Sequence, residues 1–186
     1  MSSEKSLIRK KYKIIRNKIL ADSKKELDQK IINSLIKFLT QNSYHTKKIA
    51  IFFPIGSEIN LLELYDTNIN LTLLFPRIAS NLLIFKEVTN KPDNFEYNHK
   101  YKIYEPGLSY ITAIPEIIIC PLLAFDLNKN RLGYGGGFYD RTVTLLKEAN
   151  HITYIGVAYN ILQSEKIPSS NQDHQLDFII TEDKLI

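Results

Sequence analysis

The chain has 186 residues, of which 44% are hydrophobic and 24% are charged, and its formal net charge is +4 at pH 7. These values predict one folded domain over residues 1–186 and exclude a disordered chain. No apolar run approaches the roughly 20 residues that span a bilayer, and the N-terminal residues lack the apolar core of a signal peptide. The single cysteine, Cys120, excludes an internal disulfide, so we expect a cytoplasmic protein with no membrane partner.

Positive charge is concentrated near the N-terminus. Residues 1–30 contain ten Lys and Arg against four Asp and Glu, so the remaining residues carry a small net negative charge. A nucleic-acid-binding protein would spread basic residues over a binding face, with aromatic residues between them. The basic segment is therefore either a solvated helix face or a set of cations that contacts a polyanionic ligand.

Apolar residues at helical spacing predict an amphipathic helix over about residues 4–20. The sequence Ser-Lys-Lys-Glu at 23–26 has the form of a capping box and predicts the start of a second helix. The buried face of that helix would carry Leu27, Ile31, Leu35 and Leu39.

The rest of the chain alternates between predicted strands and helices. Strands are predicted at 49–53, 71–75, 82–86, 117–124, 154–158 and 178–181, with helices at 61–65 and 139–149. Residues 87–116 are rich in proline and turn residues, and we expect loops there. Strands separated by helices predict an α/β fold, a three-layer, open, mainly parallel sheet of the Rossmann-like type, with helices on both faces and an N-terminal helical pair.

Four of the seven glycines fall within five residues, in the sequence Arg-Leu-Gly-Tyr-Gly-Gly-Gly-Phe-Tyr-Asp-Arg at 131–141. Glycines between a strand and a helix leave backbone N–H groups unshielded, so the loop can bind phosphate oxygens at the positive end of the helix. Arg131 and Arg141 add positive charge, and Asp140 supplies an oxygen ligand suited to magnesium. A mobile surface loop is the alternative, because the run is neither a Walker A sequence nor a complete dinucleotide fingerprint.

Polar and aromatic residues also follow the other predicted strands, where ligands of an open α/β sheet gather. Glu58 follows the first strand and is either a surface carboxylate or a ligand contact. The sequence Phe-Pro-Arg at 75–77 is predicted to end the second strand. The four histidines lack the spacing of zinc ligands, and no Gly-x-Ser-x-Gly elbow supports a hydrolase.

The glycine sequence and the Pro-Leu-Leu-Ala-Phe-Asp sequence at 121–126 resemble the signature of the 5-formyltetrahydrofolate cyclo-ligase family, also called 5,10-methenyltetrahydrofolate synthetases. Residues 53–59, 75–77, 105–106 and 167–182 resemble further segments of that family in the same order. The resemblance therefore covers nearly the whole chain.

The resemblance implies an ATP- and Mg²⁺-dependent conversion of 5-formyltetrahydrofolate to 5,10-methenyltetrahydrofolate. The formyl oxygen would be phosphorylated, the ring would close, and ADP and phosphate would be released. ATP would contact Lys5, Arg9, Arg131, Leu132, Gly133, Tyr134, Gly135, Gly136, Gly137, Phe138 and Tyr139. The folate would contact Phe53, Glu58, Phe138 and Tyr139; the catalytic residues would be Arg131 and Tyr139, and the magnesium ligands would be Asp140 and Asp173.

The chain departs from the family pattern in three places. Lys5 and Arg9 match an N-terminal Lys-x-x-x-Arg pair, but they lie farther from the second helix than is usual, so Lys13 or Arg16 remain alternatives. Gly136 stands where relatives often carry a basic residue, and Phe138 replaces a more usual tyrosine.

We expect a monomer or weak homo-oligomer whose partners are a reduced folate and ATP, with no nucleic acid and no membrane. A non-catalytic nucleotide or nucleic-acid binding protein that uses the basic N-terminal helix is the alternative. An enzyme of the same fold that acts on another ATP-activated amide is a third possibility.

Overall fold

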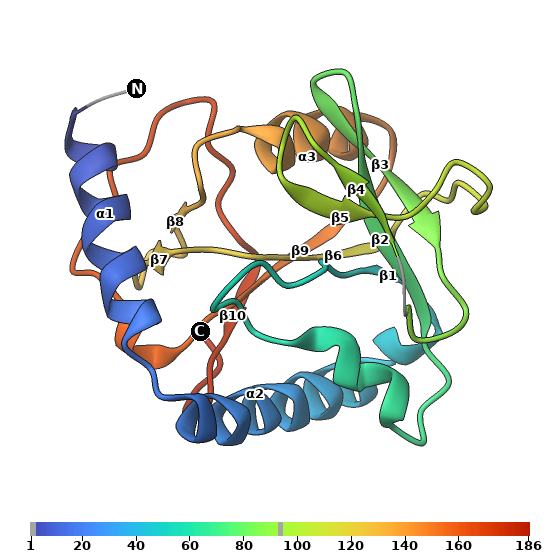
Figure 1. Ribbon diagram of the computed structural model, residues 1–186, viewed down its shortest axis with the longest axis horizontal. Helices are drawn as coiled ribbons and strands as arrows, with labels where there is room; N and C mark the ends of the chain where they lie inside the picture. Colours follow the sequence, from blue (N-terminus) through green and yellow to red (C-terminus); the bar gives the residue numbers. More distant parts are fainter. Residues whose placement is uncertain (1–2, 93–94) are drawn as a thin grey trace.

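The computed structural model describes residues 3–92 and 95–186, and its centre is a six-stranded sheet with the strand order β10-β9-β6-β1-β2-β3 (Figure 1). The strands are β1 (Lys48–Ala50), β2 (Thr72–Ala79), β3 (Leu82–Glu87), β6 (Ile117–Cys120), β9 (Thr153–Val157) and β10 (Phe178–Ile180). All neighbouring pairs are parallel except β2–β3. The mainly parallel open sheet is confirmed, and its central strands are apolar runs because both of their faces are covered.

Helices cover both faces of this sheet, as predicted. They are α1 (Ser3–Asn17), α2 (Ala21–Gln41) and α3 (Phe138–Ala149), with 3₁₀-helices η1 (Tyr44–Thr46), η2 (Leu61–Asp66) and η3 (Asn160–Leu162). In Figure 1, α2 lies below the sheet and α3 above it. The helix α2 buries Ile31, Leu35 and Leu39, which are spaced four residues apart and share one helix face.

The start of α2 differs from the prediction. The helix begins at Ala21, and its N-cap residue Leu20 makes no side-chain capping bond. The first helical hydrogen bond runs from the Lys24 N–H to the Leu20 carbonyl oxygen at 2.8 Å, so residues 23–26 lie inside the helix. The capping-box interpretation was wrong. The Lys24 ammonium instead forms an ion pair with Asp28 at 2.5 Å.

The strand β2 is longer than predicted and continues through Pro76 and Arg77. It forms an antiparallel hairpin with β3, in which Pro76 lies opposite Phe85. The ladder between β1 and β2 ends at Leu74, so Pro76 has a strand partner on one side and its missing N–H is tolerated there. Residues 75–77 therefore do not end a strand, contrary to the prediction.

The predicted strand at 117–124 is interrupted at Pro121. After β6 the chain forms a separate hairpin of β7 (Ala124–Phe125) and β8 (Arg131–Leu132). The Asp126 carboxylate closes this hairpin, because it accepts hydrogen bonds from the Asn130 N–H at 3.0 Å and the Ile167 N–H at 2.9 Å. The glycine loop thus follows a hairpin strand rather than the central strand of the sheet.

A second hairpin lies within residues 87–116, where loops were predicted. It pairs β4 (Glu96–Asn98) with β5 (Ile103–Glu105) and lies above the sheet on the side of α3 (Figure 1). The Glu105 carboxylate anchors it to β2 by accepting a hydrogen bond from the Ile78 N–H at 3.1 Å.

Candidate active site

A cavity of about 1000 Å³ opens where α1, the loop after β1, the β4–β5 hairpin and the glycine loop meet. Its lining includes all of the residues predicted to contact a ligand: Lys5, Arg9, Phe53, Glu58, Arg131, Leu132, Gly133, Tyr134, Gly135, Gly136, Gly137, Phe138, Tyr139, Asp140 and Asp173. The volume is at the upper end of the range for small-molecule sites in proteins. Segments far apart in the sequence therefore share one site.

The glycine loop leads directly into the N-terminus of α3. Gly135 and Gly137 have positive φ values of 99° and 67°, a conformation that side chains with a Cβ adopt rarely. Gly137 is the N-cap of α3, so the unpaired N–H groups of the first helical turn begin at the cavity. At Gly133 a Cβ would come within 2.9 Å of Arg131 Nη1, so the loop lies directly against that guanidinium.

Both predicted magnesium ligands are paired with cations. Arg131 Nη2 lies 2.7 Å from Asp140 Oδ1, and Lys5 Nζ lies 2.6 Å from Asp173 Oδ2. The His174 N–H, next to Asp173 in the chain, donates to Asp140 Oδ1 at 3.4 Å, which brings the two acidic segments together. Burial raises the pKa of Asp173, but hydrogen bonds from Lys5 and Ser170 outweigh it and leave the pKa below its ordinary value.

The carboxylates suit magnesium chemically, although they do not form a complete ligand shell. In residues 3–92 and 95–186, no group of three or more His, Cys, Asp or Glu side chains is arranged to hold a metal ion. Magnesium is commonly held by one or two carboxylates together with substrate phosphates and water. Asp140 and Asp173 fit that pattern only if a phosphate occupies the same cavity.

The Arg131 side chain is buried beneath the glycine loop, with an exposed fraction of 5%. Its guanidinium lies 5.9 Å from the ring centroid of Tyr139 and 5.4 Å from that of Tyr154. Arg131 Nε has no hydrogen-bond partner among the described residues. Burial also raises the pKa of Tyr139 well above its ordinary value, so its hydroxyl stays protonated. The site therefore contains a fixed positive charge and a neutral phenol.

The first helix contributes cations from one face. Arg9 Nε donates to the Gly133 carbonyl oxygen at 2.8 Å, and Lys5 pairs with Asp173 as described. Lys13 also lines the large cavity, whereas Arg16 is buried and lines a separate, much smaller cavity. Lys5 and Arg9 thus lie where the prediction requires, and of the two alternatives only Lys13 shares their cavity.

Glu58 is not a surface carboxylate, because its exposed fraction is only 3%. Oε2 accepts a hydrogen bond from the Ile55 N–H at 2.8 Å, and Oε1 lacks a hydrogen-bond partner in the described part of the chain. Burial raises the pKa of Glu58, against the opposing effects of the Ile55 N–H, Tyr134 and Arg16. A buried, partly unsatisfied carboxylate at the cavity wall is suited to bind polar donor groups of a ligand.

An aromatic wall faces these charged groups. The Phe53 ring lies 5.3 Å from Phe95 and 5.9 Å from Tyr104, and Tyr101 contacts Phe138 edge-on at 5.4 Å, all between ring centroids. The hairpin residues Tyr101 and Tyr104 were not predicted as site residues from the sequence. The similar apolar and aromatic pattern of residues 95–98 and 103–105 was the signal for a hairpin, but it was obscured by the many turn residues around it.

The fold and the cavity define an α/β protein with a deep small-molecule site that combines a glycine loop, cations, carboxylates and aromatic rings. The sequence profile described as the 5-formyltetrahydrofolate cyclo-ligase family matches residues 1–182. The chain belongs to this family, and it is an enzyme.

Relatives and solved structures agree with this assignment. The chain is 30% identical to a 5-formyltetrahydrofolate cyclo-ligase of Mycoplasma genitalium, over 95% of this chain and 97% of that protein. It is 29% identical to the protein of the same name from Haemophilus influenzae, over 92% and 94%. Its structure is similar to 5,10-methenyltetrahydrofolate synthetases of Aquifex aeolicus (TM-score 0.79, 26% identity, 97% and 91% coverage) and Mycoplasma pneumoniae (TM-score 0.75, 26% identity, 96% and 98% coverage).

Proposed function

We propose that the protein converts 5-formyltetrahydrofolate to 5,10-methenyltetrahydrofolate and uses ATP, which it releases as ADP and phosphate. The names of its relatives support the overall reaction. The use of ATP in this reaction is supported by one observation. The glycine loop, two carboxylate–cation pairs and an aromatic wall share one cavity. A phosphate donor and an aromatic acceptor can therefore bind next to each other.

ATP would bind with its triphosphate against the glycine loop and the N-terminus of α3. Backbone N–H groups there carry partial positive charge and suit phosphate oxygens. Lys5, Arg9 and Arg131 would add three full positive charges from the cavity wall. Other backbone atoms of residues 132–139, and the side chains of the non-glycine residues among them, would complete the contact.

Magnesium would be held by Asp140 and Asp173, with the remaining ligands supplied by phosphate oxygens and water. When bound, it would neutralise charge on the phosphoryl group. In this arrangement Lys5 and Arg131, now paired with the two carboxylates, are close enough to share them with the metal or to turn toward the phosphates.

The reduced folate would bind against Phe53, Phe138 and Tyr139, with Glu58 accepting hydrogen bonds from its polar edge. The oxygen of an amide-like formyl group is a poor leaving group, so transfer of a phosphoryl group to this oxygen activates the formyl carbon. The neighbouring folate amine then attacks the carbon, and phosphate departs. Arg131 would stabilise the transferred phosphoryl group and Tyr139 would orient the folate, so the protein contributes mainly positioning and charge neutralisation.

Nucleic-acid binding through α1 has less support. Lys5 and Arg9 line the cavity and are only partly exposed, and Arg16 is buried, so part of the helix's positive charge does not face outward. No helix within the described residues is both long and apolar enough to cross a bilayer. A cytoplasmic monomer or weak homo-oligomer remains a prediction.

Incubation of the protein with 5-formyltetrahydrofolate, ATP and magnesium tests the proposal. We expect the absorbance of the methenyl product to appear only when all three are present. If no product forms, and the protein instead binds oligonucleotides with an affinity that falls steeply with salt, the nucleic-acid alternative is correct.

A further inference from the structure

The last turn of α1 inserts Arg16 between three loops, where its side chain is only 5% exposed. Nε donates to Ser57 Oγ at 3.0 Å, Nη1 to the Leu122 carbonyl oxygen at 3.5 Å, and Nη2 to the Tyr134 hydroxyl. The guanidinium also lies 5.5 Å from the centroid of the Tyr134 ring. A single cation thus joins the loop after β1, the loop after β6 and the glycine loop.

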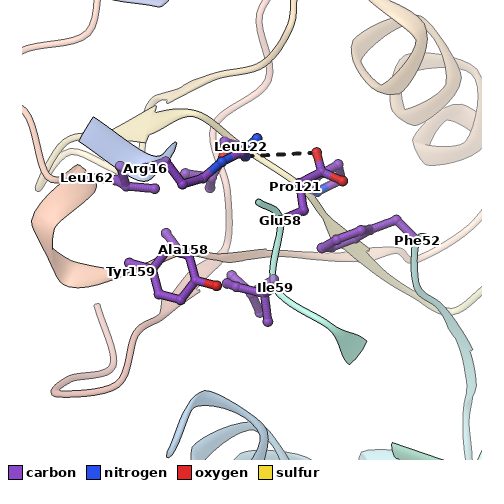
Figure 2. A pocket seen from close by; sticks show the side chains of 10 residues that line it. Arg16, Phe52, Glu58, Ile59, Pro121, Leu122, Ala158, Tyr159 and Leu162 are labelled. Atoms are coloured by element: carbon purple, nitrogen blue, oxygen red, sulfur yellow. Dashed lines mark hydrogen bonds and ion pairs between the residues drawn. The ribbon is translucent and has the colours of Figure 1, made fainter. Parts of the chain in front are cut away.

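The same cation also lies close to Glu58. Arg16 Nη1 lies 4.0 Å from Glu58 Oε1, as the dashed line in Figure 2 shows. Glu58 lines both the large cavity and a second cavity of about 10 Å³, whereas Arg16 lines only the second. The second cavity has room for no more than about one water molecule. Arg16 can therefore act on Glu58 without touching a ligand in the large cavity.

When one partner of a buried ion pair is removed, the charged form of the remaining group becomes unfavourable. The other groups around Glu58 are Tyr134 of the glycine loop, Tyr139 of α3 and Lys24 of α2. Hydrogen bonding by the Ile55 N–H and Tyr134 also lowers the pKa of Glu58, but these groups carry no positive charge, and Lys24 is already bonded to Asp28 at 2.5 Å. Arg16 is consequently the main cation that can keep Glu58 ionised.

We propose that Arg16 is a positioning residue that keeps the Glu58 carboxylate ionised and oriented at the wall of the large cavity, and that fixes Tyr134 in the glycine loop. This inference rests on the proposed function for the identity of the ligand. The Arg16 side chain would then connect the folate side of the cavity to the ATP side.

The direct test is a carbon-13 NMR titration of the Glu58 side-chain carboxyl, assigned by comparison with Glu58→Gln. In Arg16→Met we expect its titration midpoint to rise by about 1–3 pH units, because an opposite charge at this distance is lost. Arg16→Lys retains a charge without the planar guanidinium, so its midpoint should lie between those of the wild type and Arg16→Met. An unchanged midpoint in both variants would overturn the proposal.

Lys86→Met is the matched control for the loss of a buried cation. Lys86 is 5% exposed and donates to the carbonyl oxygens of Leu108 and Tyr110 and to Thr112 Oγ1, at 3.2, 2.7 and 2.9 Å. Lys86→Met should lower the melting temperature without moving the Glu58 midpoint. If Lys86→Met moves the midpoint as much as Arg16→Met does, the effect is a general loosening of the fold and the proposal fails.

Equilibrium binding of 5-formyltetrahydrofolate then separates this inference from the proposed function. Arg16→Met and Glu58→Gln should each weaken binding about tenfold to a hundredfold, and the double variant should be no weaker than either one. Additive losses would overturn the coupling of Arg16 to Glu58. If Arg16→Met shifts the Glu58 midpoint as expected but the wild-type protein does not bind the folate, the proposed function is overturned and the Arg16–Glu58 pair stands. If Arg16→Met does not fold, the same binding cycle is measured with Arg16→Lys, Glu58→Gln and their double variant.

Discussion

Asp140 forms an ion pair with Arg131, and Asp173 forms one with Lys5. We expect both cations to contact phosphate. Hydrogen bonds from Lys5 and Ser170 leave the pKa of Asp173 below its ordinary value and so favour its charged form. The two ion pairs also mean that magnesium alone competes with a positive charge at each carboxylate. Metal and triphosphate should therefore bind more tightly together than either does alone.

Substitution of either aspartate tests its role as a metal ligand. Asp140→Asn and Asp173→Asn should each reduce turnover sharply and weaken magnesium-dependent ATP binding in calorimetry, because an amide has the shape of a carboxylate but not its charge. Asp66→Asn is a suitable control, since Asp66 forms an exposed ion pair with Lys91. Unchanged ATP affinity at limiting magnesium would remove that aspartate from the metal site.

The N-terminal cations can be distinguished from one another in the same way. Lys5→Ala and Arg9→Ala should raise the KM for ATP about tenfold to a hundredfold, the equivalent of one charge-assisted contact of roughly 1.5–3 kcal/mol. Lys10→Ala is the control, because Lys10 is an exposed residue of the same helix. A larger effect at Lys13 than at Lys5 and Arg9 would show that the triphosphate lies one turn further along α1.

Two structural elements form most of the site, and they differ in how they are held. The glycine loop is fixed by the arginines around it, since Arg9 bonds the Gly133 carbonyl oxygen and Arg141 Nη2 bonds that of Gly136 at 2.9 Å. The β4–β5 hairpin contacts this loop through the Tyr101–Phe138 ring pair. A ligand in the cavity would therefore lie between an element positioned by charge and one positioned by aromatic packing.

The positive φ values of the glycine loop lead to a prediction for this element. Gly135→Val and Gly137→Val should abolish ATP binding, because a branched Cβ opposes the left-handed backbone and obstructs approach to the N–H groups. Gly56→Val is the matched control: Gly56 has a φ of +59° and lies outside the loop, and, apart from its two chain neighbours, the described residues place no atom within 4 Å of an added Cβ. Gly56→Val should lose a similar amount of thermal stability and retain ATP affinity. Nucleotide binding by both loop variants at wild-type strength would contradict the phosphate-binding role.

At the scale of the whole molecule, the sequence predicted features that depend on local pattern. The parallel sheet and the helix that follows the glycine loop come from apolar periodicity and from one short motif, and the choice of Lys5 and Arg9 comes from the resemblance to a family motif. Features that depend on distant contacts were missed. Glu58 is buried beside Arg16, which the packing of α1 against β7 and η3 brings to it, and Pro76 lies in a strand because β3 pairs with it.

The central claim is that ATP phosphorylates the formyl oxygen of the substrate before the ring closes. Isotopic labelling of that oxygen tests this claim most directly. The substrate is 5-formyltetrahydrofolate labelled with ¹⁸O in its formyl group, incubated with the protein, ATP and magnesium, and the released phosphate is analysed by mass spectrometry. If ATP phosphorylates the formyl oxygen before the ring closes, each phosphate carries one ¹⁸O atom and forms in equal amount with the methenyl product. Unlabelled phosphate, or methenyl product formed without ATP consumption, would contradict the account.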